Sequence, residues 1–239
     1  MLRPFATALA SLFFVAATSR DALAQPAPPD AAKDDMLAPS RALEIGLQAG
    51  VTQPFGDITK TRRVADLVDA GFGASLELGY RASPRWTFSA WGQFHESSAD
   101  DTFISNVAGR GAAAGLSATY HAVAFQSAGA YLSFGSGYRM LWIVPDGEEN
   151  RVLHGLDVAR VTAGIELRVS PRVALGPVVG ADLDVLLWDD PGSISFAEPL
   201  EDPRALTFLF AGVDGRFDLG GRLVARDGAR RPHPVASRR

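Results

Sequence analysis

The sequence predicts an all-β fold, an eight-stranded antiparallel up-and-down transmembrane β-barrel, and three observations lead to this prediction. Apolar and polar residues alternate in eight separate runs, and the connections between runs are short and long in turn. In addition, only Lys33 and Lys60 are lysines in a chain of 239 residues. Alternation with a period of two is typical of strands that have one apolar and one polar face.

The first run shows the pattern clearly. Between Leu43 and Val51 every second residue is apolar, and residues such as Glu44 and Gln48 occupy the other face. In the last run the parity changes between Phe210 and Val213, which indicates either a β-bulge or a different register. The eight predicted strands cover residues 43–51, 72–81, 86–95, 114–120, 132–142, 160–169, 173–187 and 205–219.

The composition of the polar face indicates which side meets water. Soluble sandwiches and lipocalin-like barrels also alternate, with the apolar face inward. Here the polar face consists of Gly, Ser, Thr and mixed charges, and lysine, which commonly guards water-facing edge strands, is absent from every run. This favours a polar interior and an apolar, lipid-facing exterior. A soluble secreted or periplasmic barrel is the structural alternative.

The connections predict the orientation of the barrel. Short periplasmic turns are expected at one end and longer extracellular loops at the other, as in barrels of bacterial outer membranes. With both termini at the short-turn end, the number of strands must be even. The short connections are 82–85, 121–128 and 170–172, and the long ones are 53–70, 96–109, 144–157 and 188–204.

The two ends of the chain lie outside the predicted barrel, which covers residues 42–220. Residues 1–24 are predicted to be a cleaved signal peptide, with Arg3, an apolar stretch over 5–18 and an Ala-Leu-Ala cleavage site at 22–24. Residues 25–41 are rich in Pro, Ala and Asp and are predicted to be a flexible periplasmic leader. Residues 221–239 are predicted to be an Arg-rich disordered tail.

Composition excludes several classes of partner and site. The formal net charge of −4 disfavours nucleic acid, and the absence of Cys removes both a disulfide framework and a lipid anchor. We expect no cofactor and no metal, because no acidic segment has the spacing of an EF-hand loop. The acidic segments are Asp100-Asp101, the Asp-Gly-Glu-Glu stretch at 146–149, and Asp189-Asp190.

Three segments carry a resemblance to a known family: Gln-Pro-Phe-Gly-Asp at 53–57, Gly-Tyr-Arg-Ala-Ser-Pro-Arg-Trp at 79–86, and Gly-Ser-Gly-Tyr-Arg at 135–139. They resemble small bacterial outer-membrane β-barrel proteins of the OmpA, OmpW and OmpX type, over about residues 42 to 220. The resemblance implies the fold, a location in the cell outer membrane, and insertion by the barrel-assembly machinery. It carries no catalytic residue across. Family members usually end on an aromatic residue, whereas here the segment 215–219 is followed by the tail.

The charged residues of the polar faces are the candidate site. An eight-stranded barrel is just wide enough for side chains to fill, so inward charges must satisfy one another. We expect a structural ion-pair network that plugs the lumen, with a narrow conducting pore as the alternative. The predicted members are Glu44, Glu77, Arg139, Arg160, Glu166, Arg168, Asp182 and Asp184.

One compact group has the residue types of a hydrolase. His95-Glu96-Ser97 lies near the outer end of the third predicted strand, where lipid A deacylases of barrel fold keep a Ser and a His. In an extended strand His95 and Ser97 share one face and Glu96 points to the other, so the spacing gives no ready triad.

Three functions are therefore open. The first expectation is a monomeric, non-enzymatic envelope or surface-interaction protein whose partners are outer-membrane lipid and lipopolysaccharide. The alternatives are a small channel or carrier for hydrophobic or small solutes, and a lipid-modifying enzyme.

Overall fold

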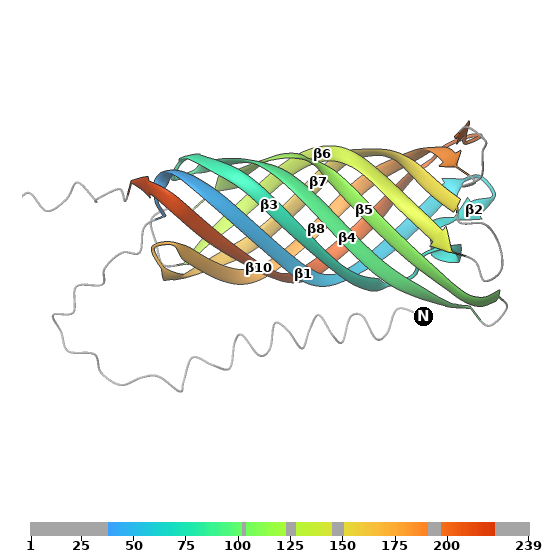
Figure 1. Ribbon diagram of the computed structural model, residues 1–239, viewed down its shortest axis with the longest axis horizontal. Coiled ribbons are helices and arrows are strands. Elements are labelled where there is room, and N and C mark those ends of the chain that lie inside the picture. The colour runs from blue at the N-terminus through green and yellow to red at the C-terminus, as the bar shows by residue number, and fades with distance from the viewer. Residues whose placement is uncertain (1–37, 102–103, 123–127, 145–150, 191–196, 223–239) are drawn as a thin grey trace, which may run out of the picture. The chain divides into compact units, whose positions relative to one another are not determined.

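The eight long strands of the computed structural model close into a barrel (Figure 1). The structure describes residues 38–101, 104–122, 128–144, 151–190 and 197–222. Each long strand pairs antiparallel with its two neighbours, and β10 pairs with both β1 and β8, which completes the ring. The long strands are β1 (Ser40–Thr59), β3 (Gly71–Ser83), β4 (Trp86–Asp101), β5 (Ile104–His121), β6 (Ala128–Val144), β7 (Arg151–Ser170), β8 (Val173–Asp190) and β10 (Ala205–Arg222).

The short elements belong to two connections at one end of the barrel. Between β1 and β3 lie β2 (Arg62–Arg63) and a 3-10 turn, η1 (Val64–Asp66), and β9 (Glu198–Pro199) precedes β10. We call this end the loop side. The other end, which holds the connections at 84–85 and 171–172, is the turn side. The predicted fold class is confirmed. Within the described residues, no helix is long and apolar enough to cross a membrane.

The two faces of each strand differ as the alternation predicts. On β1, Leu47 is 50% exposed on the outer surface, whereas Glu44 and Gln48 are buried inside. The outer surface carries large apolar side chains such as Phe72 and Leu116, and the interior carries charged and hydroxyl side chains. This arrangement, apolar outside and polar inside, is that of a transmembrane β-barrel.

The strands extend further than the hydrophobic pattern indicates. Within the predicted connection 96–109, residues 96–101 and 104–109 are strand, and strand also covers part of the predicted connection 144–157, since β7 begins at Arg151. Backbone pairing continues there, for example between Ser97 and Gly109, because ladder hydrogen bonds need no apolar face. The prediction therefore located the segments with an apolar face, and not the strand ends.

The last strand corrects another prediction. β10 pairs with β1 from Arg222 to Leu206 without a register shift, so the parity change is not a bulge. Instead, Leu206 and Phe208 point inward and are buried. At the loop side, β10 therefore contributes apolar side chains to the interior, in contrast to its polar inward residues nearer the turn side.

The ends of the barrel differ slightly from the predicted limits. β1 begins at Ser40 and β10 ends at Arg222, while Ala38, predicted to be part of a flexible leader, is buried. The backbone at Arg41 is left-handed, with φ 56°. The predicted signal peptide, most of the leader, the tail from residue 223 and the acidic stretch 146–149 lie outside the described residues.

Large inward side chains fit against inward glycines of neighbouring strands. A Cβ atom at Gly164 would lie 2.5 Å from the ring of Tyr131, and one at Gly111 would lie 2.0 Å from the ring of His95. Each ring therefore occupies space that is free only because the residue opposite is glycine. The inward glycines in this way allow aromatic side chains to fill the lumen.

Candidate functional site: the charged lumen and its apolar plug

All eight predicted lumen residues are buried inside the barrel, and the structure divides them into two groups. Glu44 on β1, Glu77 on β3, and Glu166 and Arg168 on β7 belong to a turn-side cluster. The loop-side cluster contains Arg139 on β6, Arg160 on β7, and Asp182 and Asp184 on β8. The strands bring each set together by facing the same interior.

Arg216, on β10, is the centre of the turn-side cluster. Its guanidinium lies 2.8 Å from Glu44, 2.7 Å from Asp214 and 3.4 Å from Glu166. It also lies 4.1 Å above the ring of Tyr131, whose hydroxyl donates to Asp214 at 2.9 Å. The guanidinium is thus enclosed by carboxylates and one aromatic face.

Two further arginines extend this cluster toward the turn side. Arg81 is paired with Glu44 and lies 3.2 Å from Asp218. Arg168 lies 2.9 Å from Asp218 and 3.6 Å from Glu166. Asp218 therefore bridges two arginines from different strands, β3 and β7.

Sequence reasoning left four charged residues out of this cluster: Arg81, Asp214, Arg216 and Asp218. Arg81 lies on the polar face of the run 72–81, and the other three lie on the last strand, where the parity of the apolar residues changes. Asp214, Arg216 and Asp218 alternate with Val213, Gly215 and Phe217, and this local alternation was a usable signal.

The loop-side cluster is organised by two arginines. Arg139 donates from Nε to Asp184 at 2.8 Å and from a terminal nitrogen to Asp182 at 2.6 Å. Arg160 donates to Gln93 at 2.5 Å and lies 3.5 Å from Asp182. The guanidinium of Arg160 is 4.3 Å from the ring of Trp91. The amide of Gln93 and the ring of Trp91 therefore supply contacts to the Arg160 guanidinium in addition to the carboxylate of Asp182.

An apolar plug closes the lumen above this cluster. It consists of buried side chains from the barrel wall together with Val64 from η1, which folds into the mouth. The guanidinium of Arg139 lies 4.2 Å from the Phe208 ring, so the plug rests directly on the ionic layer. The plug residues are Ile58, Val64, Leu141, Ile143, Leu153, Leu186, Leu206 and Phe208.

Ion pairs at the rim hold the connection that carries η1. Lys60 lies 2.5 Å from Asp202, and Arg62 lies 3.8 Å from Asp189, which also accepts from Arg151 at 2.5 Å. Partial burial and the nearby Arg151 lower the pKa of Arg62 from its ordinary value. The rim contacts join the β1–β3 connection to β7, β8 and the segment before β10.

The lumen contains more acids than bases. In the described residues the two clusters bury five arginines and eight carboxylates, and Arg81, Arg139 and Arg216 are each at most 1% exposed. The carboxylates are Glu44, Glu77, Asp157, Glu166, Asp182, Asp184, Asp214 and Asp218.

The His95-Glu96-Ser97 group does not assemble. His95 is buried against Phe208, at 5.2 Å between ring centroids, and neither ring nitrogen has a hydrogen-bond partner. Ser97 donates to the Gly109 carbonyl at 3.3 Å, while Glu96 lies on the outer surface, 3.1 Å from Arg110. Among the described residues, no group of three His, Asp or Glu is placed to hold a metal ion.

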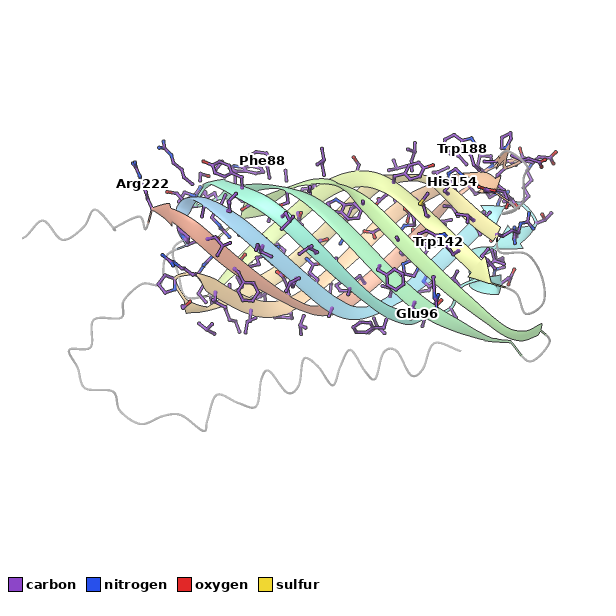
Figure 2. The ribbon with its side chains drawn as sticks, in the orientation of Figure 1. Phe88, Glu96, Trp142, His154, Trp188 and Arg222 are labelled. Carbon is purple, nitrogen blue, oxygen red and sulfur yellow. The ribbon has the colours of Figure 1, made fainter. Side chains whose placement is uncertain are left out.

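Several aromatic residues lie toward the two ends of the outer surface. Figure 2 shows Trp142, His154 and Trp188 toward the loop side and Phe88 toward the turn side. Trp188 stacks on His154 at 5.5 Å, and Trp86 stacks on Phe88 at 6.3 Å. Such placement suits amphipathic rings at the two interfaces of a membrane.

No protein-family model matches the chain, and none of the curated proteins matches it. Solved structures that resemble it are small outer-membrane β-barrel proteins. Neisserial surface protein A is 13% identical, with a TM-score of 0.49, over 74% of this chain and 97% of its own. OprG from Pseudomonas aeruginosa is 10% identical, with a TM-score of 0.47, over 77% and 99%. Ail from Yersinia pestis is 14% identical, with a TM-score of 0.40, over 74% and 99%.

Proposed function

We propose that this chain is a non-conducting, non-enzymatic barrel of the outer membrane with a structural or surface-interaction role. The observation that carries the proposal is the closed lumen. Two ionic layers, centred on Arg216 and Arg139, lie in series with the apolar plug around Phe208. A barrel filled in this way acts through its rims and its lipid-facing wall.

The outer surface supports a membrane location. Phe72 is 62% and Leu116 is 70% exposed, and they belong to an apolar wall on all eight strands. A soluble protein rarely exposes a continuous apolar surface of this kind, because water around it costs free energy. Lipid is therefore the proposed permanent partner of the wall, with lipopolysaccharide as its outer-leaflet component, and the proposed barrel is a monomer.

The same geometry argues against the channel alternative. A hydrated ion entering from the loop side would first have to displace the plug, which contains no polar side chain. It would then have to separate Arg139 from Asp182 and Asp184, and breaking a buried ion pair leaves uncompensated charge. Both steps are unfavourable without a large rearrangement.

The predicted group of the enzyme alternative, His95-Glu96-Ser97, does not form an assembled nucleophile. A catalytic serine needs a base within hydrogen-bond reach that is oriented by a third group. Ser97 instead donates to a backbone carbonyl, and Glu96 faces away from His95. This supports the non-enzymatic assignment.

Conductance in planar lipid bilayers tests the proposal. Folded protein, verified by its heat-dependent gel migration, is reconstituted, and insertion is measured in parallel by co-flotation with liposomes. We expect no stepwise conductance from inserted protein. Reproducible conductance steps whose size changes in Arg139→Ala would overturn the closed-lumen proposal in favour of a channel. Hydrolysis of lipopolysaccharide acyl chains that is lost in Ser97→Ala would overturn the non-enzymatic assignment.

A further inference from the structure

The loop-side cluster contains one carboxylate that neither of its arginines pairs. Arg139 donates to both Asp182 and Asp184, and the nearest carboxylate partner of Arg160 is again Asp182. The third carboxylate, Asp157 on β7, is 1% exposed, and neither of its oxygens has a hydrogen-bond partner. A buried carboxylate without any donor is the least expected group in a filled lumen.

A register irregularity in β7 places this group inside. Gly135 of β6 pairs with Arg160, whereas Gly137 pairs with Asp157, so three steps on β7 match two on β6. This β-bulge turns both Asp157 and Arg160 inward, although residues three apart in a regular strand face opposite sides. The exposed residues on either side of Asp157, Leu156 and Val158, point to the outer surface.

Asp157 directly faces a second carboxylate with a free oxygen. In the β7–β8 ladder Asp157 pairs with Asp184, whose Oδ2 atom also has no hydrogen-bond partner. Residues opposite each other in an antiparallel ladder have Cβ atoms about 4.5–5.5 Å apart. Two carboxyl groups at this separation can share one hydrogen bond if one of them carries a proton.

The surroundings favour that proton over a second negative charge. The charged groups that face the pair are Arg139 on β6, Arg160 on β7 and Asp182 on β8. Phe208 on β10 and His95 on β4 complete the layer next to Arg139. Two arginines against three carboxylates leave one charge without compensation, and two adjacent carboxylates in a water-poor site do not both ionise.

We propose that Asp157 and Asp184 form a proton-binding site in the lumen, in which the two carboxyl groups share a single proton. The proton is held by Asp157 and donated to the free oxygen of Asp184, while Arg139 stays paired with Asp184. Loss of the proton adds a third negative charge, beside those of Asp182 and Asp184, near Arg139, which also contacts the plug through Phe208. The site does not depend on whether the lumen conducts.

The linkage between this proton and folding has a definite sign. The folded barrel retains a proton that an unfolded aspartate releases below neutral pH. Proton release is therefore coupled to unfolding, and the free energy of unfolding falls as the pH rises through the neutral range. An amide at position 157 can donate to Asp184 without a titratable proton, so Asp157→Asn removes this dependence.

Infrared difference spectroscopy on the folded protein in liposomes tests the site. Because Glu77 also has a buried oxygen without a partner, all samples carry Glu77→Gln. We expect the carbonyl band of a protonated carboxylic acid at neutral pH, its loss at alkaline pH, and its absence at all pH values in Asp157→Asn. In urea, the unfolding midpoint of the parent should fall as the pH rises, and that of Asp157→Asn should not.

Asp218→Asn is the matched control, since Asp218 is a buried carboxylate with two arginine partners. It should retain the carbonyl band and unfold at lower urea at neutral pH. Absence of the band from the parent would overturn the proposal without affecting the closed-lumen proposal. So would a neutral-pH loss of stability in Asp157→Asn as large as in Asp218→Asn. If Asp157→Asn does not fold, the titration of the band in the parent alone decides the outcome.

Discussion

At the scale of single residues, the arginines of the lumen differ in kind from those on the surface. Arg216 is enclosed by Glu44, Asp214 and Glu166, while Arg110 pairs with Glu96 at a site where both side chains are about half exposed. Removing one partner of a buried pair leaves the other charges uncompensated, whereas an exposed pair is screened by water. The N–O distance of an ion pair does not by itself distinguish the buried pair from the exposed one, since it is 2.8 Å for Arg216–Glu44 and 3.1 Å for Arg110–Glu96.

We therefore expect Arg216→Met to lower the free energy of unfolding by about 3–5 kcal/mol. The measurement is urea unfolding in liposomes, followed by the fraction of protein that keeps the folded gel mobility. Arg110→Met is the matched control and should change stability by about 0–1 kcal/mol. Equal effects of the two substitutions would mean that Arg216 is not in a solvent-excluded network.

The sequence was sufficient to find eight lumen charges but not their partners. Alternation predicts the side of the wall to which Glu44 or Asp182 points, because a strand has a fixed period of two. It does not predict that Arg216 reaches Glu44, which is 172 residues away along the chain, since that contact depends on how the barrel closes. Asp157 was assigned to a connection, because the bulge beside it breaks the period on which the prediction relied.

At the scale of elements, inward glycines make room for inward rings. Tyr131 on β6 lies over the position of a Cβ atom at Gly164 on β7, and the same Tyr131 hydroxyl donates to Asp214. A methyl group at Gly164 would push the ring away from Asp214 and Arg216. Gly92, in contrast, has no atom within 4 Å of its added Cβ position.

Gly164→Ala should consequently destabilise the barrel by about 1–3 kcal/mol, the usual cost of overpacking. Gly92→Ala should be neutral within about 0.5 kcal/mol. The same urea titration compares the two variants. A neutral Gly164→Ala would show that Tyr131 can move without loss, and that the glycine is not required by packing.

The register of β10 decides where the plug ends. Phe208 faces the lumen and Leu209 faces outward, in a strand that pairs with β1 without a bulge. The alternation failed here because an apolar plug replaces the polar interior, so apolar residues occur on both faces of the strand. Between Leu206 and Phe210 the pairing partners distinguish the two faces, whereas from Val213 onward the strand's own alternation does so.

Single-cysteine labelling checks this register directly, because the chain contains no cysteine. A spin label at Leu209→Cys should be accessible to oxygen dissolved in the lipid phase. A label at Phe208→Cys should be inaccessible or should destabilise the fold, since the plug has no room for it. The opposite order of accessibility would mean that β10 contains a bulge or pairs in a different register.

At the scale of the whole molecule, the barrel reverses the arrangement found in soluble proteins, because its charged side chains lie inside and its apolar side chains lie outside. The fold class could be predicted from the sequence because the alternation, the connection lengths and the scarcity of lysine are repeated over all the strands of the barrel. The ends of the strands could not be predicted from the sequence, because backbone pairing continues beyond the segments that have an apolar face. Residues of β4 and β5 beyond Glu96 and Arg110 continue the ladder in this way.

The direction in which the apolar wall faces gives the most decisive prediction for the whole molecule. Leu76 and Leu183 lie on the outer surface of β3 and β8, and each is more than 40% exposed. If this wall contacts the bilayer, Leu76→Arg and Leu183→Arg should each lower the free energy of unfolding in liposomes by about 2–4 kcal/mol, because an arginine would lie at the depth of the hydrocarbon. Glu201→Arg, on the exposed connection before β10, should have little effect. Should the two leucine variants instead raise solubility without detergent and leave stability unchanged, the wall would face water and the barrel would not be a membrane protein.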